Sequence, residues 1–117
     1  MNNRLLGAEY EDRAAGYLEA RGYRILERNF RCRMGEIDLI ADDGGVRVFV
    51  EVKYRAGTSS GDALSAVDCR KQRKISRVAL FYLMRHGLTA DTPCRFDVIG
   101  INGDQITLVR DAFPYRG

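Results

Sequence analysis

Residues 35–55 read GEIDLIADDGGVRVFVEVKYR, with two strand-like runs on either side of a turn. The runs, residues 36–41 and 46–55, are rich in β-branched side chains. Residues 42–45 (DDGG) between them have the composition of a hairpin turn. The stretch therefore predicts an antiparallel hairpin, and its second run is the strongest strand in the chain.

Successive side chains of a strand point to opposite faces, so the predicted hairpin has one apolar and one charged face. Val48, Val50 and Val52 are expected on the buried face, whereas Glu51 and Lys53 are expected on the other. The buried face is also expected to contain three more residues: Ile37, Leu39 and Tyr54.

The hairpin register decides whether the acidic residues of the two strands meet. A two-residue loop at residues 43–44 pairs Glu36 with Glu51, and a four-residue loop pairs Asp38 with Glu51. Both bring Asp38, Glu51 and Lys53 to one face, whereas a three-residue loop would separate them.

Carboxylates crowded on one sheet face repel each other unless a cation or solvent lies among them. Oxygen ligands without His or Cys suit Mg²⁺ or Mn²⁺, which polarises a phosphoryl oxygen and lowers the pKa of water. A lysine two residues beyond a carboxylate ligand can stabilise the developing charge. The same alternation is typical of a solvent-facing strand, so the spacing leaves both interpretations open.

The remaining elements follow from periodicity and from capping residues. We expect a helix at residues 5–21 ended by Gly22, strands at 23–31, 94–101 and 105–110, and a helix from the N-cap Asp68 to about His86. A loop is expected at 56–61, with a short helical turn at 62–67. The order α-β-β-β-α-β-β predicts an α/β fold, a mixed sheet flanked by helices. Residues 1–117 form one domain, with loose termini at about 1–4 and 114–117.

Composition narrows the classes of protein. The chain has 117 residues, is 45% hydrophobic and 30% charged, and lacks an apolar run near the 20 residues that a membrane span needs. No apolar signal region follows the N-terminus, so we expect a cytoplasmic protein without a membrane partner or a nucleotide cofactor. Cys32, Cys69 and Cys94 are widely spaced, which favours small core residues over a zinc site.

The net charge of +3 hides strong segregation along the chain. Residues 1–35 sum to +2, residues 36–52 to −4, residues 53–90 to +6 and residues 91–117 to −1. The positive region follows the acidic one, and its candidate phosphate contacts are Arg55, Arg70, Lys71, Gln72 and Lys74. Arg95 and Asp97 share one strand face, and we expect a structural ion pair there.

Several motifs resemble the YraN family, whose members are predicted to be endonuclease-like. They are GxxxExxAxxYL from Gly7, GEIDLI from Gly35, FVEVKYR from Phe49, KQRK from Lys71 and RFDV from Arg95. The resemblance spans about residues 7–113. The family in turn looks like a branch of the PD-(D/E)XK nuclease superfamily, near the archaeal Holliday junction resolvases.

The resemblance implies a restriction-endonuclease-like core and Mg²⁺- or Mn²⁺-dependent hydrolysis of DNA. Asp38 takes the place of the metal-binding Asp, and Glu51 and Lys53 take the (D/E)xK positions. Glu11 matches an acid on the first helix that lies near the metal in resolvase-like members. The Val52 carbonyl is a candidate third ligand, and Glu36 is a candidate supporting residue. Ile37 stands where many superfamily members have proline.

The resemblance favours an endonuclease acting on DNA, with branched or damaged DNA as candidate substrates. A homodimer is expected by analogy, because two symmetric cuts need two sites. The alternatives are a non-catalytic nucleic-acid-binding module on a nuclease fold and a protein-interaction domain with a solvated acidic strand face.

Overall fold

The structure is a computed structural model that describes residues 3–55 and 67–117. The elements are α1 (Asn3–Glu19), β1 (Arg24–Cys32), β2 (Gly35–Asp43), β3 (Val46–Arg55), α2 (Cys69–Arg85), β4 (Cys94–Asn102) and β5 (Gln105–Val109). The predicted order α-β-β-β-α-β-β and the mixed α/β class are confirmed. The loop expected at 56–61 and the helical turn at 62–67 lie outside the described residues, apart from the buried Val67.

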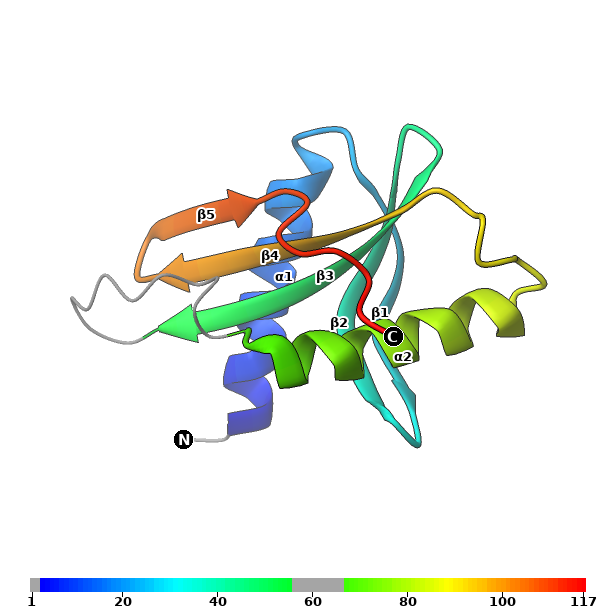
Figure 1. The fold of residues 1–117 in the computed structure, drawn as a ribbon. Coiled ribbons are helices and arrows are strands. Elements are labelled where there is room, and N and C mark those ends of the chain that lie inside the picture. Colours follow the sequence, from blue (N-terminus) through cyan, green and yellow to red (C-terminus); the bar gives the residue numbers. More distant parts are fainter. Residues whose placement is uncertain (1–2, 56–66) are drawn as a thin grey trace.

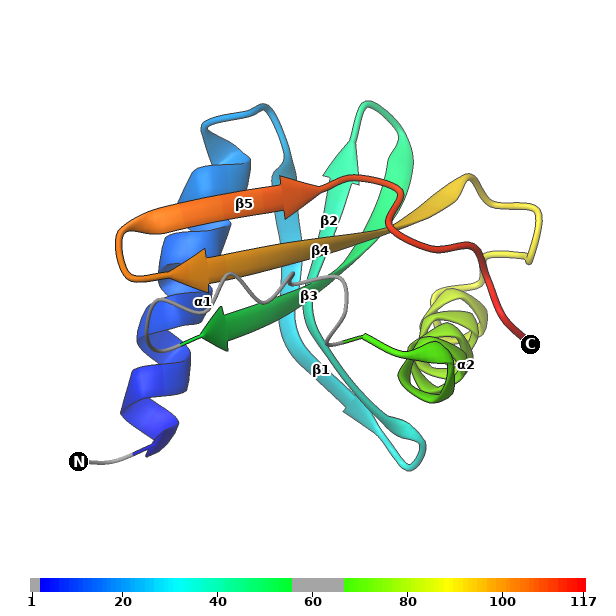
Figure 2. The same ribbon diagram turned by 60° about the vertical axis from the view of Figure 1, so that its left-hand side comes forward.

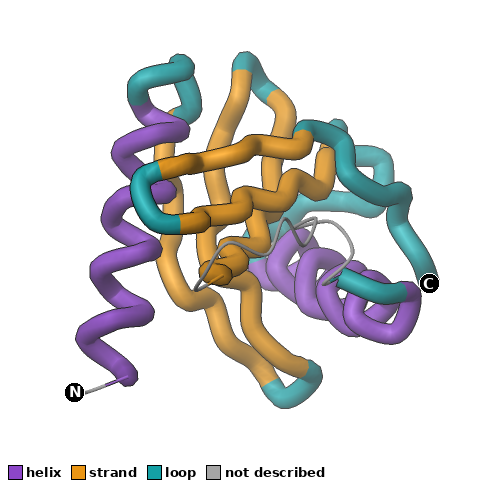
Figure 3. Tube along the Cα trace, turned by 90° about the vertical axis from the view of Figure 1, so that its left-hand side faces the viewer, coloured by secondary structure: helices purple, strands orange, loops and turns teal. Residues whose placement is uncertain are grey.

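The described strands form one sheet in the order β1-β2-β3-β4-β5. β3 and β4 are parallel, and the segment between them that contains α2 supplies the crossover that a parallel pair needs. The other neighbouring strands are antiparallel. Figures 1 and 2 show α1 and α2 on opposite faces of this sheet. In Figure 3 the sheet lies between the two helices. Neither helix is long and apolar enough to cross a membrane.

Each sheet face has its own hydrophobic core. Val48 and Val50 of β3 pack with Leu39 and with α1, whereas Phe49 packs with Ile37 and with α2. Leu39 therefore lies beside the valines as predicted, but the prediction for Ile37 is wrong. The β2–β3 pairing begins at Leu39, and on the other side of Asp38 the strand turns Ile37 toward the opposite helix.

Local capping signals place the helix ends. Asp68 is the N-cap of α2 and accepts a hydrogen bond from the Lys71 backbone N–H at 2.9 Å, as its residue type predicts. α1 ends two residues earlier than predicted, and Gly22 (φ +90) turns the chain after it toward β1. Beyond β5, Phe113 stacks on Phe96 and the Arg116 backbone N–H donates to Ser76.

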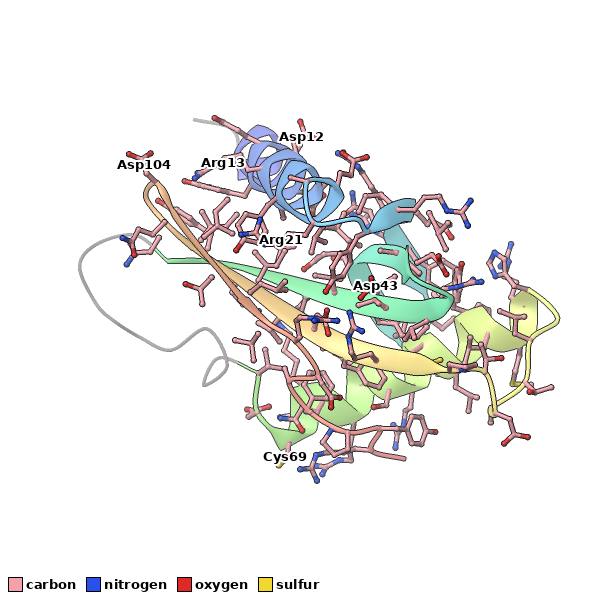
Figure 4. The ribbon with its side chains drawn as sticks, turned by 90° about the horizontal axis from the view of Figure 1, so that it is seen from above. Asp12, Arg13, Arg21, Asp43, Cys69 and Asp104 are labelled. Atoms are coloured by element: carbon pink, nitrogen blue, oxygen red, sulfur yellow. The ribbon has the colours of Figure 1, made fainter. Side chains whose placement is uncertain are left out.

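Two predictions about the core are wrong. Tyr54 is 40% exposed and stacks on Tyr10 with ring centroids 3.9 Å apart, because the end of β3 lies at the margin of the α1 core. Cys69 and Cys94 are exposed, and Cys32 is half-buried. Cys69 is the first residue of α2 (Figure 4), and its side chain is in contact with solvent there.

On the α1 face of the sheet, a buried ionic network joins β2, β4, the residue before β1 and the segment after β5. The Asp97 carboxylate is 1% exposed and accepts hydrogen bonds from the Tyr23 hydroxyl (2.9 Å), the Arg95 Nε (3.0 Å) and the Asp111 backbone N–H (2.9 Å). Arg95 also reaches Asp43, at the end of β2, at 2.8 Å. The predicted structural role of Arg95 and Asp97 is confirmed.

Asp97→Ala is expected to lower the free energy of unfolding by about 3–5 kcal/mol, because Arg95 and Tyr23 keep buried polar atoms without their acceptor. Asp12→Ala is the matched control, since Asp12 pairs with Arg28 at the surface and such pairs contribute about 1 kcal/mol or less. Urea denaturation of both variants measures the difference. Equal losses would contradict a structural role for the network.

Candidate metal centre and nucleic-acid surface

The β2–β3 turn sets the register of the candidate site. The turn is Gly44-Gly45, whose φ angles of +61 and +96 lie in the left-handed region that glycine tolerates. Asp43 pairs with Val46, and the register continues to Leu39 and Val50. The turn has two residues, but it stands one position later than the loop at residues 43–44. The register is the one predicted for the four-residue loop.

The same register brings Asp38 beside Glu51 at the end of the β2–β3 pairing. Asp38 Oδ2 accepts a hydrogen bond from the Val52 backbone N–H at 2.8 Å, which fixes one carboxylate oxygen against β3. The Glu51 side chain, on the α2 face of the sheet, is hydrogen-bonded to Asp38. Glu51 is 8% exposed and Asp38 is half-buried, so the two carboxyl groups meet where little solvent reaches them.

Burial and the neighbouring carboxyl group change the ionisation of this pair. Burial, followed by the hydrogen bond to Glu51 and its charge, raises the pKa of Asp38 from 3.8 to about 9. Burial acts in the same direction on Glu51, but hydrogen bonds from Asp38 and Lys71 outweigh it and lower the pKa of Glu51. Without a further cation, the pair holds one proton at neutral pH.

Two lysines approach Glu51 from different elements. The Nζ of Lys71, in the first turn of α2, lies 2.8 Å from Glu51 Oε2, and the Nζ of Lys53, two residues along β3, lies at 3.5 Å. Burial lowers the pKa of Lys53, with a further contribution from Lys71. Burial also acts to lower the pKa of Lys71, but the bond to Glu51 outweighs it, so that pKa is raised. Lys71 was predicted as a phosphate contact, and its place on Glu51 was not foreseen.

Glu11 lies near this centre but makes a different contact. Its Oε1 accepts a hydrogen bond from the Asn29 side-chain amide at 2.9 Å, and its charge is among the smaller causes that raise the pKa of Asp38. Asn29 has a left-handed backbone (φ 52). It lies in β1 at the position that faces Asp38 of β2, between the pairs Arg28–Leu39 and Phe30–Ile37. Within residues 3–55 and 67–117, no three His, Cys, Asp or Glu side chains form a group able to hold a metal.

The other predicted site residues lie along α2 and the β1–β2 hairpin. Glu36 pairs with Arg31 on the exposed hairpin at 3.1 Å. The Gln72 amide donates to the Val67 carbonyl and accepts from Arg116 Nε, so both ends of this side chain have protein partners. Arg70, Lys71 and Lys74 line one hollow of about 520 Å³. The Arg55 backbone ends β3, and its side chain lies outside the described part of the chain.

The chemistry of Asp38 and Glu51 fits a divalent cation with oxygen ligands. Mg²⁺ usually keeps several waters and binds proteins through one or two carboxylates together with substrate phosphates. A cation between the two groups would replace the shared proton, because it favours the ionised form of both. Val52 contributes its N–H to the geometry seen here, by orienting Asp38.

Most of the chain matches a known protein family. The profile of the family described as "Uncharacterised protein family UPF0102" matches residues 10–101. The chain belongs to the UPF0102 family. This confirms the predicted YraN-like family resemblance.

Curated UPF0102 proteins resemble the chain over most of its length. A UPF0102 protein of Lachnoclostridium phytofermentans is 45% identical over 117 residues, which cover 100% of this chain and 99% of that protein. One of Halorhodospira halophila is 50% identical, with 92% and 85% covered. One of Symbiobacterium thermophilum is 52% identical, with 85% and 83% covered. The chain therefore matches each of these relatives over more than four fifths of its length.

The raised pKa of Asp38 predicts how the metal-free protein responds to pH. The unfolded chain releases this proton near pH 4 and the folded chain holds it to about pH 9. The free energy of unfolding therefore falls as pH rises between these values. Asp38→Asn removes this loss, because an amide can accept from Val52 and donate to Glu51 without ionising. In EDTA at pH 8, urea denaturation should find this variant more stable than the wild type.

Glu36→Gln, on the exposed hairpin, is the control and should keep the wild-type dependence on pH between pH 5 and 8.5. A parallel pH profile for Asp38→Asn and the wild type would contradict the shared proton.

Proposed function

We propose that this UPF0102 protein is a metal-dependent endonuclease that hydrolyses DNA phosphodiester bonds, with branched or damaged DNA as candidate substrates. The observation that carries the proposal is the pairing of half-buried Asp38 with buried Glu51, with Lys53 beside them. These residue types occupy the positions that the resemblance to PD-(D/E)XK nucleases assigns to the metal ligands and the lysine. Mg²⁺ or Mn²⁺ is the proposed cofactor.

Each side chain has a distinct part in this proposal. Asp38 and Glu51 would hold the cation, with the Val52 carbonyl and Glu11 as further candidate ligands. The cation would polarise a phosphoryl oxygen and lower the pKa of a water molecule. Lys53 would orient that water and donate a hydrogen bond to the charged phosphoryl oxygens in the transition state.

Water is the second reactant in the proposed hydrolysis. The water oxygen forms a bond to phosphorus while the bond from phosphorus to one sugar oxygen breaks. One water proton leaves to solvent, the leaving sugar oxygen gains a proton, and the other product keeps a phosphate monoester. Lys71, now on Glu51, could move to a substrate phosphate once a cation neutralises that carboxylate.

Three variants test the catalytic set. Asp38→Asn, Glu51→Gln and Lys53→Met should each lower the rate of Mn²⁺-dependent cleavage by at least about a hundredfold. Cleavage is followed on supercoiled plasmid, linear duplex and a four-way junction. Calorimetry should show loss of Mn²⁺ binding in the two carboxylate variants and its retention in Lys53→Met.

Asp42→Asn is the matched control, because Asp42 lies on the same strand, four residues beyond Asp38, opposite Arg47. It should cleave at the wild-type rate. If the wild type and Asp38→Asn cleave DNA equally, the cleaving activity does not come from this site and the proposal fails.

One observation favours a second candidate, a non-catalytic nucleic-acid-binding module. Glu11 bonds to Asn29, so Asp38 and Glu51 meet without a third acidic ligand among the described residues. This module would bind DNA through the α2 cations Arg70 and Lys74 without metal-dependent turnover.

Both candidates share one expectation about salt. Lys74→Ala should weaken DNA binding and reduce the slope of log affinity against log salt concentration by about 1, because one phosphate contact is lost. Arg21→Ala is the control, since Arg21 lies beyond the end of α1 and packs on Tyr17. Fluorescence anisotropy at several salt concentrations measures both slopes. Equal slopes for Lys74→Ala and the wild type would remove Lys74 from the interface.

A further inference from the structure

Two hollows lie side by side between α2 and the end of the β1–β2 hairpin. The first, of about 520 Å³, is lined by Met34 and α2 cations, and the second, of about 580 Å³, by Met34, Phe81 and three arginines. Met34 belongs to both, so they form one surface that we call the α2 groove. Figures 1 and 2 show the hairpin end reaching below α2.

A glycine allows the hairpin to come this close to α2. A Cβ atom on Gly35 would lie 3.3 Å from Lys74 Cγ and 3.5 Å from Val78 Cγ2. The hairpin therefore packs directly on the helix at Gly35.

The α2 groove is strongly cationic along its length. Its positive side chains are Arg31, Arg33, Arg70, Lys71, Arg73, Lys74, Arg77 and Arg85. Arg31 pairs with Glu36 and Lys71 with Glu51, whereas the others form no ion pair with another described residue. Asp68, the acidic lining residue, is engaged as the helix N-cap. This charge is complementary to a polyanion.

Lys71 connects the groove to the candidate metal centre, because its ammonium lies on Glu51. From Lys71 to Arg85 the helix rises about 21 Å, at 1.5 Å per residue. At about 3.4 Å per nucleotide of a stacked strand, this length accommodates at most about six nucleotides. The groove therefore starts at the carboxylate pair, next to Lys71, and extends in one direction from it, along α2 to Arg85.

An aromatic ring interrupts the cationic lining. Phe81 is 37% exposed, although its ring also contacts the core residue Phe30 (centroids 6.2 Å apart). Arg31, Arg33 and Arg85 surround its hollow, and Met34 is equally exposed there. An apolar ring among phosphate-binding cations suits an unstacked base, whose face it can cover. A duplex presents phosphates but keeps its base faces stacked, so it would leave Phe81 in water.

We propose that the α2 groove binds a single-stranded segment of the DNA, with its phosphates on the α2 cations and one base stacked on Phe81. The proposal rests on the proposed function for its link to the carboxylate pair. It deepens that function, because it makes the substrate a strand that is unpaired on one side of the cut.

The chain contains no tryptophan, so Phe81→Trp introduces a single fluorescent reporter into the groove. The probe is a 12-nucleotide thymidine strand added in EDTA, which prevents metal-dependent cleavage. We expect its binding to quench the tryptophan at position 81, because the base stacks on the indole ring. An abasic strand of the same length and charge should bind without this quenching, as should a 12-base-pair duplex.

Tyr115→Trp is the matched control. Tyr115 is 53% exposed and lines a different cavity, together with Phe113 and Leu83. Its tryptophan should keep its fluorescence when the strand binds. In addition, Phe81→Leu keeps an apolar side chain against Phe30 but lacks a ring, and should weaken strand binding about tenfold, whereas Tyr115→Leu should not.

The possible results separate this proposal from the proposed function. Unchanged fluorescence at position 81 with the strand bound, equal quenching by the abasic strand or the duplex, or no strand binding in low salt would each overturn the single-strand groove. None of these results touches metal-dependent cleavage, which the Asp38 and Glu51 variants test. Quenching as expected, with no cleavage in Mg²⁺ or Mn²⁺, would keep the groove and overturn the nuclease.

Discussion

Gly44 and Gly45 close the β2–β3 hairpin with left-handed backbone angles, which fixes Asp43 opposite Val46. The register that follows pairs Leu39 with Val50 and then brings Asp38 beside Glu51. A slip of one residue would send one of the two carboxyl groups to the opposite face of the sheet. The bond from Glu51 to Lys71 and the link from the carboxylate pair to the α2 groove therefore depend on this turn.

Asp97 and Asp38, on the two faces of the sheet, have opposite surroundings. Asp97, on the α1 face, accepts from a tyrosine, an arginine and a backbone N–H, so its charge is well compensated. Asp38 has only the Val52 N–H and a carboxyl neighbour, and burial together with that neighbour raises the pKa of Asp38 to about 9. An arrangement that opposes folding at neutral pH is typical of a functional site rather than of a structural one. This contrast supports a cation-binding role for Asp38 and Glu51.

The features that could be predicted from the sequence are those with local causes. The elements could be predicted from strand alternation, from the Asp68 N-cap and from the glycine turn. The possible lengths of the hairpin loop predicted that Asp38 and Glu51 share one face. The wrong or missing predictions concern contacts between distant segments. Lys71 bonds to Glu51, which lies 20 residues earlier in another element, and Gln72 is held by Arg116, which lies 44 residues further along the chain. No local pattern shows that Tyr54 lies outside the core and stacks on Tyr10.

The proposed function depends on whether Asp38 and Glu51 form a site for a divalent cation. Crystals of the protein soaked in Mn²⁺, with anomalous diffraction data, test it most directly because Mn²⁺ is located without any assumption about activity. We expect an anomalous peak between the two carboxylates, with Lys71 displaced from Glu51. Data without a peak there, in which Asp38 stays hydrogen-bonded to Glu51 and Lys71 stays in place, would contradict a cation site.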